Sequence, residues 1–443
     1  MYLPLQDDEK LPRTAFTAKG GVELSLPELS GAQSADVLVI GGGIGGCSAA
    51  LHATEAGSKV ILLEAHKIGW GASGRNGGHV APATKHDPHE IIAKYGTAAG
   101  QRLIDAAEDG PKVVADLIAR HKIDCEFSVP GIVSAAHTPA ALSSMAKRVD
   151  YWASRGRPVE MLDRRQAAAT IGSDYYLGAW LDRRGAKLNP LAYVRGLAAA
   201  AIRAGAALYE HTKALSLTKQ AGKWVVRTSQ GEVRADAVFL CTNAYTDNLW
   251  PGLRQTIVSV RAFQFMTRPL RDNVLKTILP GGQPMTDSRR LLSGIRLHSD
   301  GRLQFGGQGP AFGPQGKPAW GPTLGRLQKI FPQLGEIEAD FWWTGFMAMN
   351  NDNSWHIHEL SPGLLAMLGC NGRGVALATI YGRELARYAH GVPASDFVLP
   401  PTPPRRIFAH SVVEPFVSGL IQYYAFRDAV EIRRLERANP VTT

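Results

Sequence analysis

Cysteine is scarce in this chain, with four residues among 443. The four thiols lie far apart in the sequence, and no two of them form a C-x-x-C pair: Cys47, Cys125, Cys241 and Cys370. This spacing argues against a disulfide framework and against a cysteine-based zinc site, so no bound metal is expected. Scattered thiols are typical of a reducing compartment. The sequence therefore predicts a cytoplasmic protein.

Long apolar runs are also missing. The N-terminus has no apolar signal core, and no stretch is long enough to span a bilayer. Although the net charge is +10, the basic residues are dispersed and form no nucleic-acid-binding motif. The charge fits an anionic cofactor, an acidic substrate or an anionic surface better than it fits a nucleic acid. His86 and His89 have no third metal ligand at helical spacing, which favours two ordinary loop histidines.

The most informative stretch runs from residue 35 to residue 81. Residues 35–40 are typical of a short buried strand, and Gly41, Gly43 and Gly46 then form G-x-G-x-x-G before a predicted helix over 44–56. A second strand over 59–63 ends at Glu64, about 20 residues past the first glycine, where a ribose-binding carboxylate belongs. The complete order of strand, turn, helix, strand and acid predicts a dinucleotide-binding unit.

A second glycine-rich loop, GWGASGRNGG, spans residues 69–78 and is followed by His79. A unit that binds NAD does not need this loop directly after its ribose acid. A flavin is longer and flatter, and glycines would let the backbone approach its ring. The side chains of Ser73, Arg75 and Asn76 offer hydrogen-bond donors to phosphate, ribitol or ring carbonyls.

The two loops together resemble the amine-oxidising flavoproteins related to D-amino-acid oxidase, sarcosine oxidase and glycine oxidase. Within that family, G-A-S-G-R-N-G-G is most similar to the γ-glutamylputrescine oxidase-like branch. The resemblance implies an α/β (α+β overall) fold, in which a Rossmann-type FAD-binding domain is interleaved with a substrate domain built on a large antiparallel sheet.

The C-terminal half contains a second strand–turn–helix segment that fits this resemblance. A strand over 364–368 precedes G-C-N-G-R-G, and a helix is predicted over 375–389. In the resembled family this turn directs a helix N-terminus at the N1/C2 edge of the flavin, where it would stabilise a reduced anionic ring. The strand over 237–241 ends in Thr242-Asn243-Ala244 and is implied to meet the dinucleotide from the opposite side.

Matching the family motifs to this sequence gives the residues expected to bind FAD. They are Gly41, Gly43, Ile44, Gly45, Gly46, Glu64, Ala65, Gly71, Ala72, Ser73, Arg75, Asn76, Gly77, Gly78, His79, Thr242, Asn243, Ala244, Gly372, Arg373, Gly374, Val375 and Ala376. Some sarcosine oxidases attach the flavin through a cysteine before the C-terminal motif. Here that region reads T-G-F-M-A-M-N, so non-covalent FAD is expected.

The resemblance also implies a discontinuous domain plan. An N-terminal arm over 1–32 precedes a FAD-binding domain made of 33–90, 187–255 and 347–395. The substrate domain is expected to comprise 91–186 and 256–346, because the latter segment alternates like a half-solvated antiparallel sheet. Residues 396–443 form a proline-rich linker and an amphipathic C-terminal tail. The tail is expected either to pack on the protein's own surface or to contact a membrane peripherally, at its inner face.

The implied reaction oxidises the C–N bond of an amine or amino acid. A hydride passes to flavin N5, the imine hydrolyses, and oxygen reoxidises the flavin with release of hydrogen peroxide. Four residues are candidates for the catalytic site: His79, Arg261, Arg296 and His356. His79 could bias amine protonation, and either arginine could fix an acidic substrate group. His356 and His358 alternate on one strand, so both could line the site, or one could be a core histidine.

Three alternatives remain open. The family's oxygen-activating lysine corresponds to about Ala376, so a dehydrogenase that feeds a quinone or another acceptor is one of them. A flavoenzyme for a hydroxy acid, such as glycerol-3-phosphate or 2-hydroxyglutarate, is the second, although G-A-S-G-R-N-G-G argues against it. The third is a non-enzymatic FAD-binding subunit, against which the two intact motifs argue.

Overall fold

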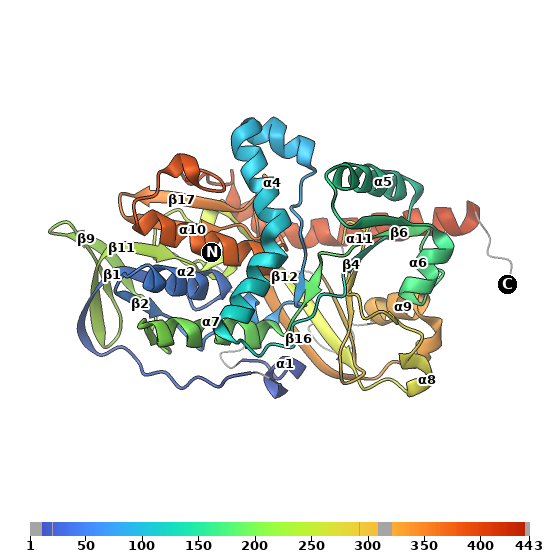
Figure 1. Ribbon diagram of the computed structural model, residues 1–443, viewed down its shortest axis with the longest axis horizontal. Coiled ribbons are helices and arrows are strands. Elements are labelled where there is room, and N and C mark those ends of the chain that lie inside the picture. The colour runs from blue at the N-terminus through green and yellow to red at the C-terminus, as the bar shows by residue number, and fades with distance from the viewer. Residues whose placement is uncertain (1–10, 20, 292, 309–320, 439–443) are drawn as a thin grey trace. The chain divides into compact units, whose positions relative to one another are not determined.

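We describe the protein from a computed structural model covering residues 11–19, 21–291, 293–308 and 321–438. The chain forms two compact units (Figure 1). The first unit combines residues 1–127, 188–260 and 345–411, and the second combines 128–187, 261–344 and 412–443. Both units are therefore discontinuous in sequence.

The first unit is built on an eight-stranded sheet within the described residues. The strand order along the main path is β17-β18-β11-β1-β2-β8, and β10 and β9 extend from β11 as an antiparallel meander. These strands are β1 (Gly31–Ile40), β2 (Val60–Leu63), β8 (Ala207–Tyr209), β9 (Ser216–Gln220), β10 (Lys223–Arg227), β11 (Gly231–Leu240), β17 (His356–Ser361) and β18 (Leu364–Leu368).

Five strands of this sheet, from β18 to β8, are parallel to one another. The apolar end of β1 and all of β2 and β18 are buried, as expected for a parallel sheet covered on both faces. Because parallel strands end at the same edge, the turns after β1, β2, β11 and β18 all lie along one side of the sheet. Ligands of open α/β sheets bind at this edge.

Helices cover this sheet, and two of them approach each other closely. Figure 1 shows α2 beside α10 over the strands, and a side chain at Gly382 of α10 would collide with the Gly45 carbonyl of α2. The helices of the unit are α1 (Ala15–Ala18), α2 (Ile44–Glu55), α3 (Ala72–Arg75), α4 (Pro88–His121), α7 (Pro190–Ala204) and α10 (Val375–Ala389), with β3 (His79–Val80) between α3 and α4. Short 3-10 turns lie at Asn243–Tyr245, Arg254–Thr256 and Ala394–Asp396.

The second unit is built on another sheet, with the strand order β16-β12-β15-β14-β13-β4-β6-β5. Most neighbouring strands are antiparallel, whereas β13 and β4 are parallel. The strands are β4 (Ile132–Ala136), β5 (Val159–Leu162), β6 (Gly178–Asp182), β12 (Val258–Thr267), β13 (Met285–Asp287), β14 (Gly294–Leu297), β15 (Leu303–Gln308) and β16 (Ala339–Met349), and β7 (Ala186–Lys187) follows β6 in the chain.

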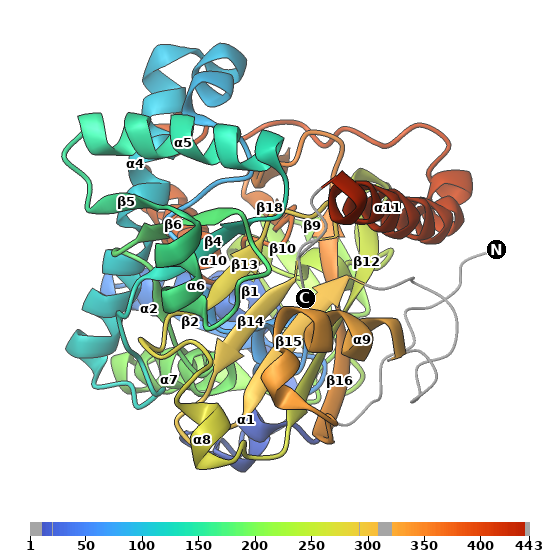
Figure 2. The same ribbon diagram turned by 90° about the vertical axis from the view of Figure 1, so that its right-hand side faces the viewer.

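One face of this sheet forms a hydrophobic core with the helix α9 (Gly321–Ile330). Phe265 and Phe305 stack at 5.6 Å, and Leu327 and Ile330 of α9 pack into the same cluster. Figure 2 shows α9 beside β14 and β15. The remaining helices are α5 (Pro139–Ser154), α6 (Arg164–Ile171) and α8 (Asp272–Leu275), with a 3-10 turn at Pro332–Leu334.

The last helix, α11 (His410–Ala438), joins the second unit through ion pairs. Arg290 Nη1 lies 2.9 Å from Asp428 Oδ1 and 2.7 Å from Glu431 Oε2. Among the described helices, none combines the length and the apolar character needed to cross a membrane.

Local backbone signals fix two further places in the second unit. Thr138 Oγ1 accepts a hydrogen bond from the Ala141 N–H and so caps α5, and Gly301 has φ +81° in the turn between β14 and β15. The strand β4 begins at Ile132, directly after Pro130 and Gly131. Proline cannot donate to a ladder, and Gly131 has φ +88°.

The division into units differs from the predicted domain plan at α4. The predicted substrate domain begins at residue 91, but residues up to 127 lie in the first unit. The cause is packing between helices: Gly110 of α4 lies against Ala376 and Ile380 of α10. The predicted tail is also divided, because residues 396–411 belong to the first unit and 412–443 to the second.

Candidate functional site

The first glycine turn joins β1 to α2 in a backbone conformation that requires glycine. Gly41 has φ +112°, and its N–H donates to the Leu63 carbonyl at 2.9 Å. A Cβ at Gly41 would lie 2.8 Å from the Cys241 carbonyl oxygen, and a Cβ at Gly46 would collide with the carbonyl of Gly41. The turn therefore leaves the N-terminus of α2 open at the sheet edge, where it favours an anion.

Glu64 lies beside this turn at the end of β2. Its Oε2 accepts the Gly42 N–H at 2.7 Å, and its Oε1 accepts the His66 N–H at 2.8 Å. Burial raises the pKa of the Glu64 carboxyl, while the N–H groups of His66 and Gly42 act in the opposite direction. Each carboxylate oxygen can accept a second hydrogen bond. Glu64 can therefore hold the glycine turn and still bind the hydroxyls of a ribose.

The second glycine loop is connected to the first through side chains. Ser73 Oγ accepts the Ile44 N–H at 2.9 Å. Asn76 Oδ1 accepts the Gly78 N–H at 2.8 Å, and Asn76 Nδ2 donates to the carbonyls of Ser73 and Ala72 at 2.9 and 3.2 Å. The sequence prediction treated Ser73 and Asn76 as donors to a ligand. In the structure both also fix the loop's own backbone.

Arg75 contacts Trp70 rather than standing at the loop surface. Its side chain is buried, Nε donates to the Trp70 carbonyl at 2.7 Å, and the guanidinium carbon lies 4.8 Å from the indole centroid. The Tyr245 ring lies 5.2 Å from that of Trp70 and covers Gly71. Trp70 and Tyr245 thus complete the loop, and the motif alone did not identify them.

Three asparagines organise the turn after β18. Asn243 Oδ1 accepts the Gly369 N–H at 3.1 Å. Asn371, at φ +46°, donates through Nδ2 to the Gly369 carbonyl at 2.7 Å and to Asn350 Oδ1 at 3.1 Å. This network fixes the backbone of the second motif, which precedes the N-terminus of α10 at Val375. Asn350 was missed because its partners are distant in sequence.

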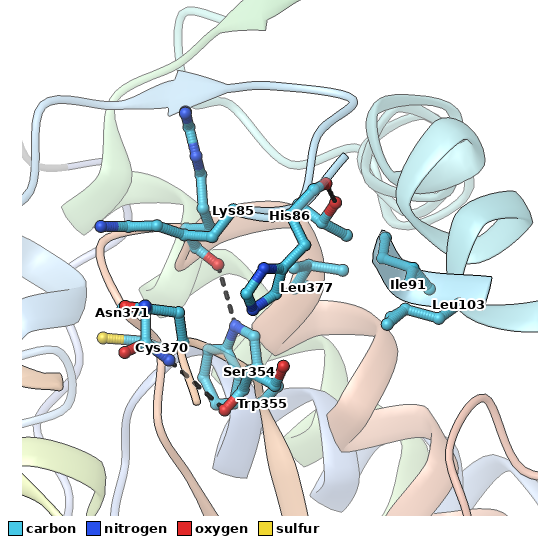
Figure 3. A pocket seen from close by; sticks show the side chains of 12 residues that line it. Lys85, His86, Ile91, Leu103, Ser354, Trp355, Cys370, Asn371 and Leu377 are labelled. Atoms are coloured by element: carbon cyan, nitrogen blue, oxygen red, sulfur yellow. Dashed lines mark hydrogen bonds between the residues drawn. The ribbon is translucent and has the colours of Figure 1, made fainter. Parts of the chain in front are cut away.

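A pocket lies beside this second turn (Figure 3). The lining residues are Thr84, Lys85, His86, Ile91, Leu103, Asn353, Ser354, Trp355, Cys370, Asn371, Arg373 and Leu377. Trp355 Nε1 donates to the Arg373 carbonyl at 3.0 Å. Although the Lys85 side chain is exposed at the rim, desolvation by the surrounding protein and the charge of Arg373 lower its pKa. The sequence reasoning assigned no role to Lys85.

The candidate catalytic histidines of the first unit differ in their surroundings. His79, half-buried on β3, directly follows the second loop. His356 Nε2 lies 3.0 Å from both carboxylate oxygens of Asp352, and its ring stacks on His358 at 5.2 Å. β17 ends the strand order of the sheet, so His356 lies on an edge strand. The hydrogen bonds to Asp352 fix the His356 ring. A catalytic role stays a prediction for His356 and for His79, the histidine next to the loop.

The candidate arginines belong to strands of the second sheet. Arg296 of β14 is buried and lies opposite Gln304 of β15 in the strand register. Its neighbours Ile295 and Leu297 face the hydrophobic core, so Arg296 points to the other face of the sheet. Gln304 Nε2 donates to Gln264 Oε1 at 2.8 Å on that same face. Arg261 is also buried, on β12.

Ala376 contacts α4 through its side chain. It is buried, and a Cβ placed on Gly110 would lie 2.8 Å from the Ala376 Cβ. The Ala376 side chain therefore faces α4. Only the backbone of Ala376, in the first turn of α10, remains a candidate for cofactor contact.

These residues fit a flavin dinucleotide. Two glycine turns place the N-termini of α2 and α10 along one sheet edge, with Glu64 beside the first of them. A side chain at Gly41 or Gly46 would collide with a backbone carbonyl, so only glycine fits the first turn. Among the described residues, no group of three histidine, cysteine or acidic side chains could hold a metal ion.

Comparison with known proteins agrees with this geometry. Residues 36–388 match the DAO family model, described as FAD dependent oxidoreductase. The chain belongs to the DAO family. This DAO-family protein is 33% identical over 367 residues to a probable oxidoreductase OrdL of Rhizobium meliloti, a match covering 82% of this chain and 85% of that protein. It is 31% identical to the γ-glutamylputrescine oxidoreductase of Escherichia coli, covering 90% and 93% of the two chains.

A solved structure supports the fold. The crystal structure of glycine oxidase from Geobacillus kaustophilus superposes with a TM-score of 0.72 at 20% identity, covering 85% of this chain and all of that one. The expected fold class and family are confirmed, and the protein is an FAD-dependent oxidoreductase. The individual contacts of the residues predicted to bind FAD stay predictions.

Proposed function

We propose that this flavoenzyme oxidises the C–N bond of an amine or amino acid. Substrate, oxygen and water give a carbonyl compound, the released amine or ammonia, and hydrogen peroxide. The E. coli relative named for γ-glutamylputrescine aligns over 90% of this chain, and that alignment is the observation that carries the substrate class. The bound FAD would supply the two-electron chemistry.

The chain's own residues would bind and orient. Glu64 and the two glycine turns would hold the dinucleotide, and the N-terminus of α10 would favour negative charge near it. Arg296 would fix a carboxylate or another acidic group of the substrate through its planar fork, with Gln264 and Gln304 offering amide groups on the same sheet face. His79 would take up or release a proton at the substrate amine.

The electron acceptor is the second part of the proposal. We favour oxygen, with Lys85 and Arg373 as sources of positive charge beside the second turn, because a nearby cation stabilises superoxide as it forms. A quinone-type acceptor is the second candidate. It is favoured by Ala376, which stands where the resembled family has its oxygen-activating lysine.

One stopped-flow experiment tests the acceptor. The substrate-reduced enzyme is mixed with oxygen or with a soluble quinone, and flavin reoxidation is followed. Reoxidation by oxygen at least as fast as turnover supports an oxidase, and Lys85→Met should then slow it. Fast reoxidation by the quinone alone would establish a dehydrogenase.

A cytoplasmic location is part of this proposal. The four cysteines are free and buried, which suits a protein that folds in a reducing compartment. Alkylation with a thiol reagent after unfolding in cell extracts would show whether the thiols are reduced.

A further inference from the structure

The helix α11 has an apolar outer face. Five large side chains on it are exposed: Val412 by 54%, Phe416 by 71%, Leu420 by 45%, Tyr423 by 49% and Phe426 by 64%. Their spacings of three and four residues place them on one side of a helix. Contiguous exposed apolar surface of this kind marks an interaction site, whereas scattered exposed residues do not.

The opposite face of α11 explains why the apolar outer face is exposed. Ile421 and Asp428 are buried, and Asp428 Oδ2 accepts the Leu291 N–H at 3.3 Å while Oδ1 binds Arg290. Glu431 binds the same arginine. Turning the helix to bury Phe416 and Phe426 would break these ion pairs, so among the described residues of the second unit these apolar side chains stay exposed.

The charges on α11 indicate what can cover it. Two of its acids, Asp428 and Glu431, are bound to Arg290. Arg427 is exposed among the apolar side chains, and its Nη1 donates to the Tyr423 hydroxyl at 2.8 Å. The sequence adds Arg433, Arg434 and Arg437 near the end of the helix, in a chain of net charge +10. A cationic, aromatic helix face is complementary to anionic lipid headgroups.

We propose that the outer face of α11 is a docking surface for an anionic lipid bilayer. The helix lies in the plane of the interface, with Phe416, Leu420 and Phe426 below the headgroups and Arg427 among the phosphates. A second copy of this chain suits the surface less well, since it would bring two cationic chains together. This proposal concerns a surface outside the flavin site and does not depend on the proposed reaction.

Vesicle sedimentation tests the proposal with the full chain. The holoenzyme is mixed with sucrose-loaded vesicles of phosphatidylcholine, or of phosphatidylcholine with phosphatidylglycerol, and the bound fraction is measured. Binding is expected only with the anionic vesicles, and it should weaken at 0.5 M salt, roughly a threefold shorter Debye length than at 0.05 M. The double variant Phe416→Glu/Phe426→Glu should bind about tenfold more weakly, because it loses apolar contact and gains negative charge.

Leu215→Glu provides the matched control. Leu215 is 57% exposed and lies outside α11, so its replacement should leave vesicle binding unchanged. Thermal unfolding shows whether each variant folds. A second measurement uses Phe426→Cys, which can be labelled selectively because the native cysteines are buried. The emission of an environment-sensitive dye at this position should shift to shorter wavelength on anionic vesicles.

Three results would overturn the proposal. They are absence of binding to anionic vesicles, equal binding by the double variant, and a dye signal that does not respond to lipid. If light scattering shows a dimer that the double variant loses, with no vesicle binding by either protein, the partner is a second copy of the chain.

Discussion

Replacing Glu64 with glutamine tests how the dinucleotide edge is held. The carboxylate accepts two backbone N–H groups, from Gly42 at 2.7 Å and from His66 at 2.8 Å. Glutamine has one acceptor oxygen, so its amide group would face one of these donors. A hydrogen bond to a charged group contributes about 1.5–3 kcal/mol, and a neutral one about half as much. The mutation weakens the glycine turn and any hydrogen bond from a ribose hydroxyl to Glu64. We therefore expect FAD affinity to fall by about 1.5–3 kcal/mol, roughly 10- to 150-fold in Kd.

Fluorescence titration of the apoenzyme with FAD measures this loss. The matched control is Glu210→Gln: Glu210 is buried nearby and Oε1 accepts the Ile68 N–H at 2.7 Å, a bond that glutamine can keep. Thermal unfolding of both apoproteins separates a weakened loop from a lost ribose contact. Equal FAD affinity of the wild type and Glu64→Gln would refute the role assigned to this carboxylate.

Three further outcomes are expected. Acid precipitation should leave the yellow flavin in the supernatant, and colour in the pellet would disprove non-covalent binding. Arg296→Met should raise KM for an acidic substrate without loss of FAD, as should Arg261→Met if that residue contacts substrate; wild-type kinetics in both variants would place substrate recognition elsewhere. Burial and, second, the charge of His356 lower the pKa of His358 to about 4. The folded state therefore favours the neutral imidazole, so the contribution of His358 to the free energy of unfolding is complete above about pH 6.5 and is lost as the pH falls toward 4. Between pH 7 and pH 5 the free energy of unfolding, measured with urea, should fall by up to about 2 kcal/mol less in His358→Gln than in the wild type. An equal fall in both proteins would contradict this.

The glycine positions of the first motif were sufficient to predict its structure. Gly41 needs a positive φ and Gly46 has no room for a side chain, so the sequence pattern and the geometry have the same cause. The helices α2 and α10 begin at the predicted residues for the same reason, because each follows a glycine turn after a buried strand. The presence of FAD was predictable from these motifs together with the resemblance to known flavoproteins.

Contacts that no sequence motif encodes limited the remaining predictions. Arg75 looks like a phosphate ligand in sequence, but its Nε binds the Trp70 carbonyl. His356 looks like a site residue by alternation, yet Asp352 holds it. Nothing local predicts that α4 packs on α10 or that Asn350 fixes the second turn. The partners of Arg75 and His356 lie only five and four residues away, but no motif encodes these contacts. The partners of α4 and of Asn350 are far apart along the chain, and only folding brings them together.

Anaerobic bleaching of the bound flavin tests the proposed reaction most directly. The holoenzyme, free of oxygen, is mixed with a panel of amines and amino acids, with hydroxy acids as a control panel, and absorbance is followed at about 450 nm, where oxidised flavins absorb. An amine or amino acid should bleach the flavin, and the matching carbonyl compound should appear in equal amount. Bleaching by a hydroxy acid alone, or by no compound while dithionite reduces the flavin normally, would contradict C–N oxidation.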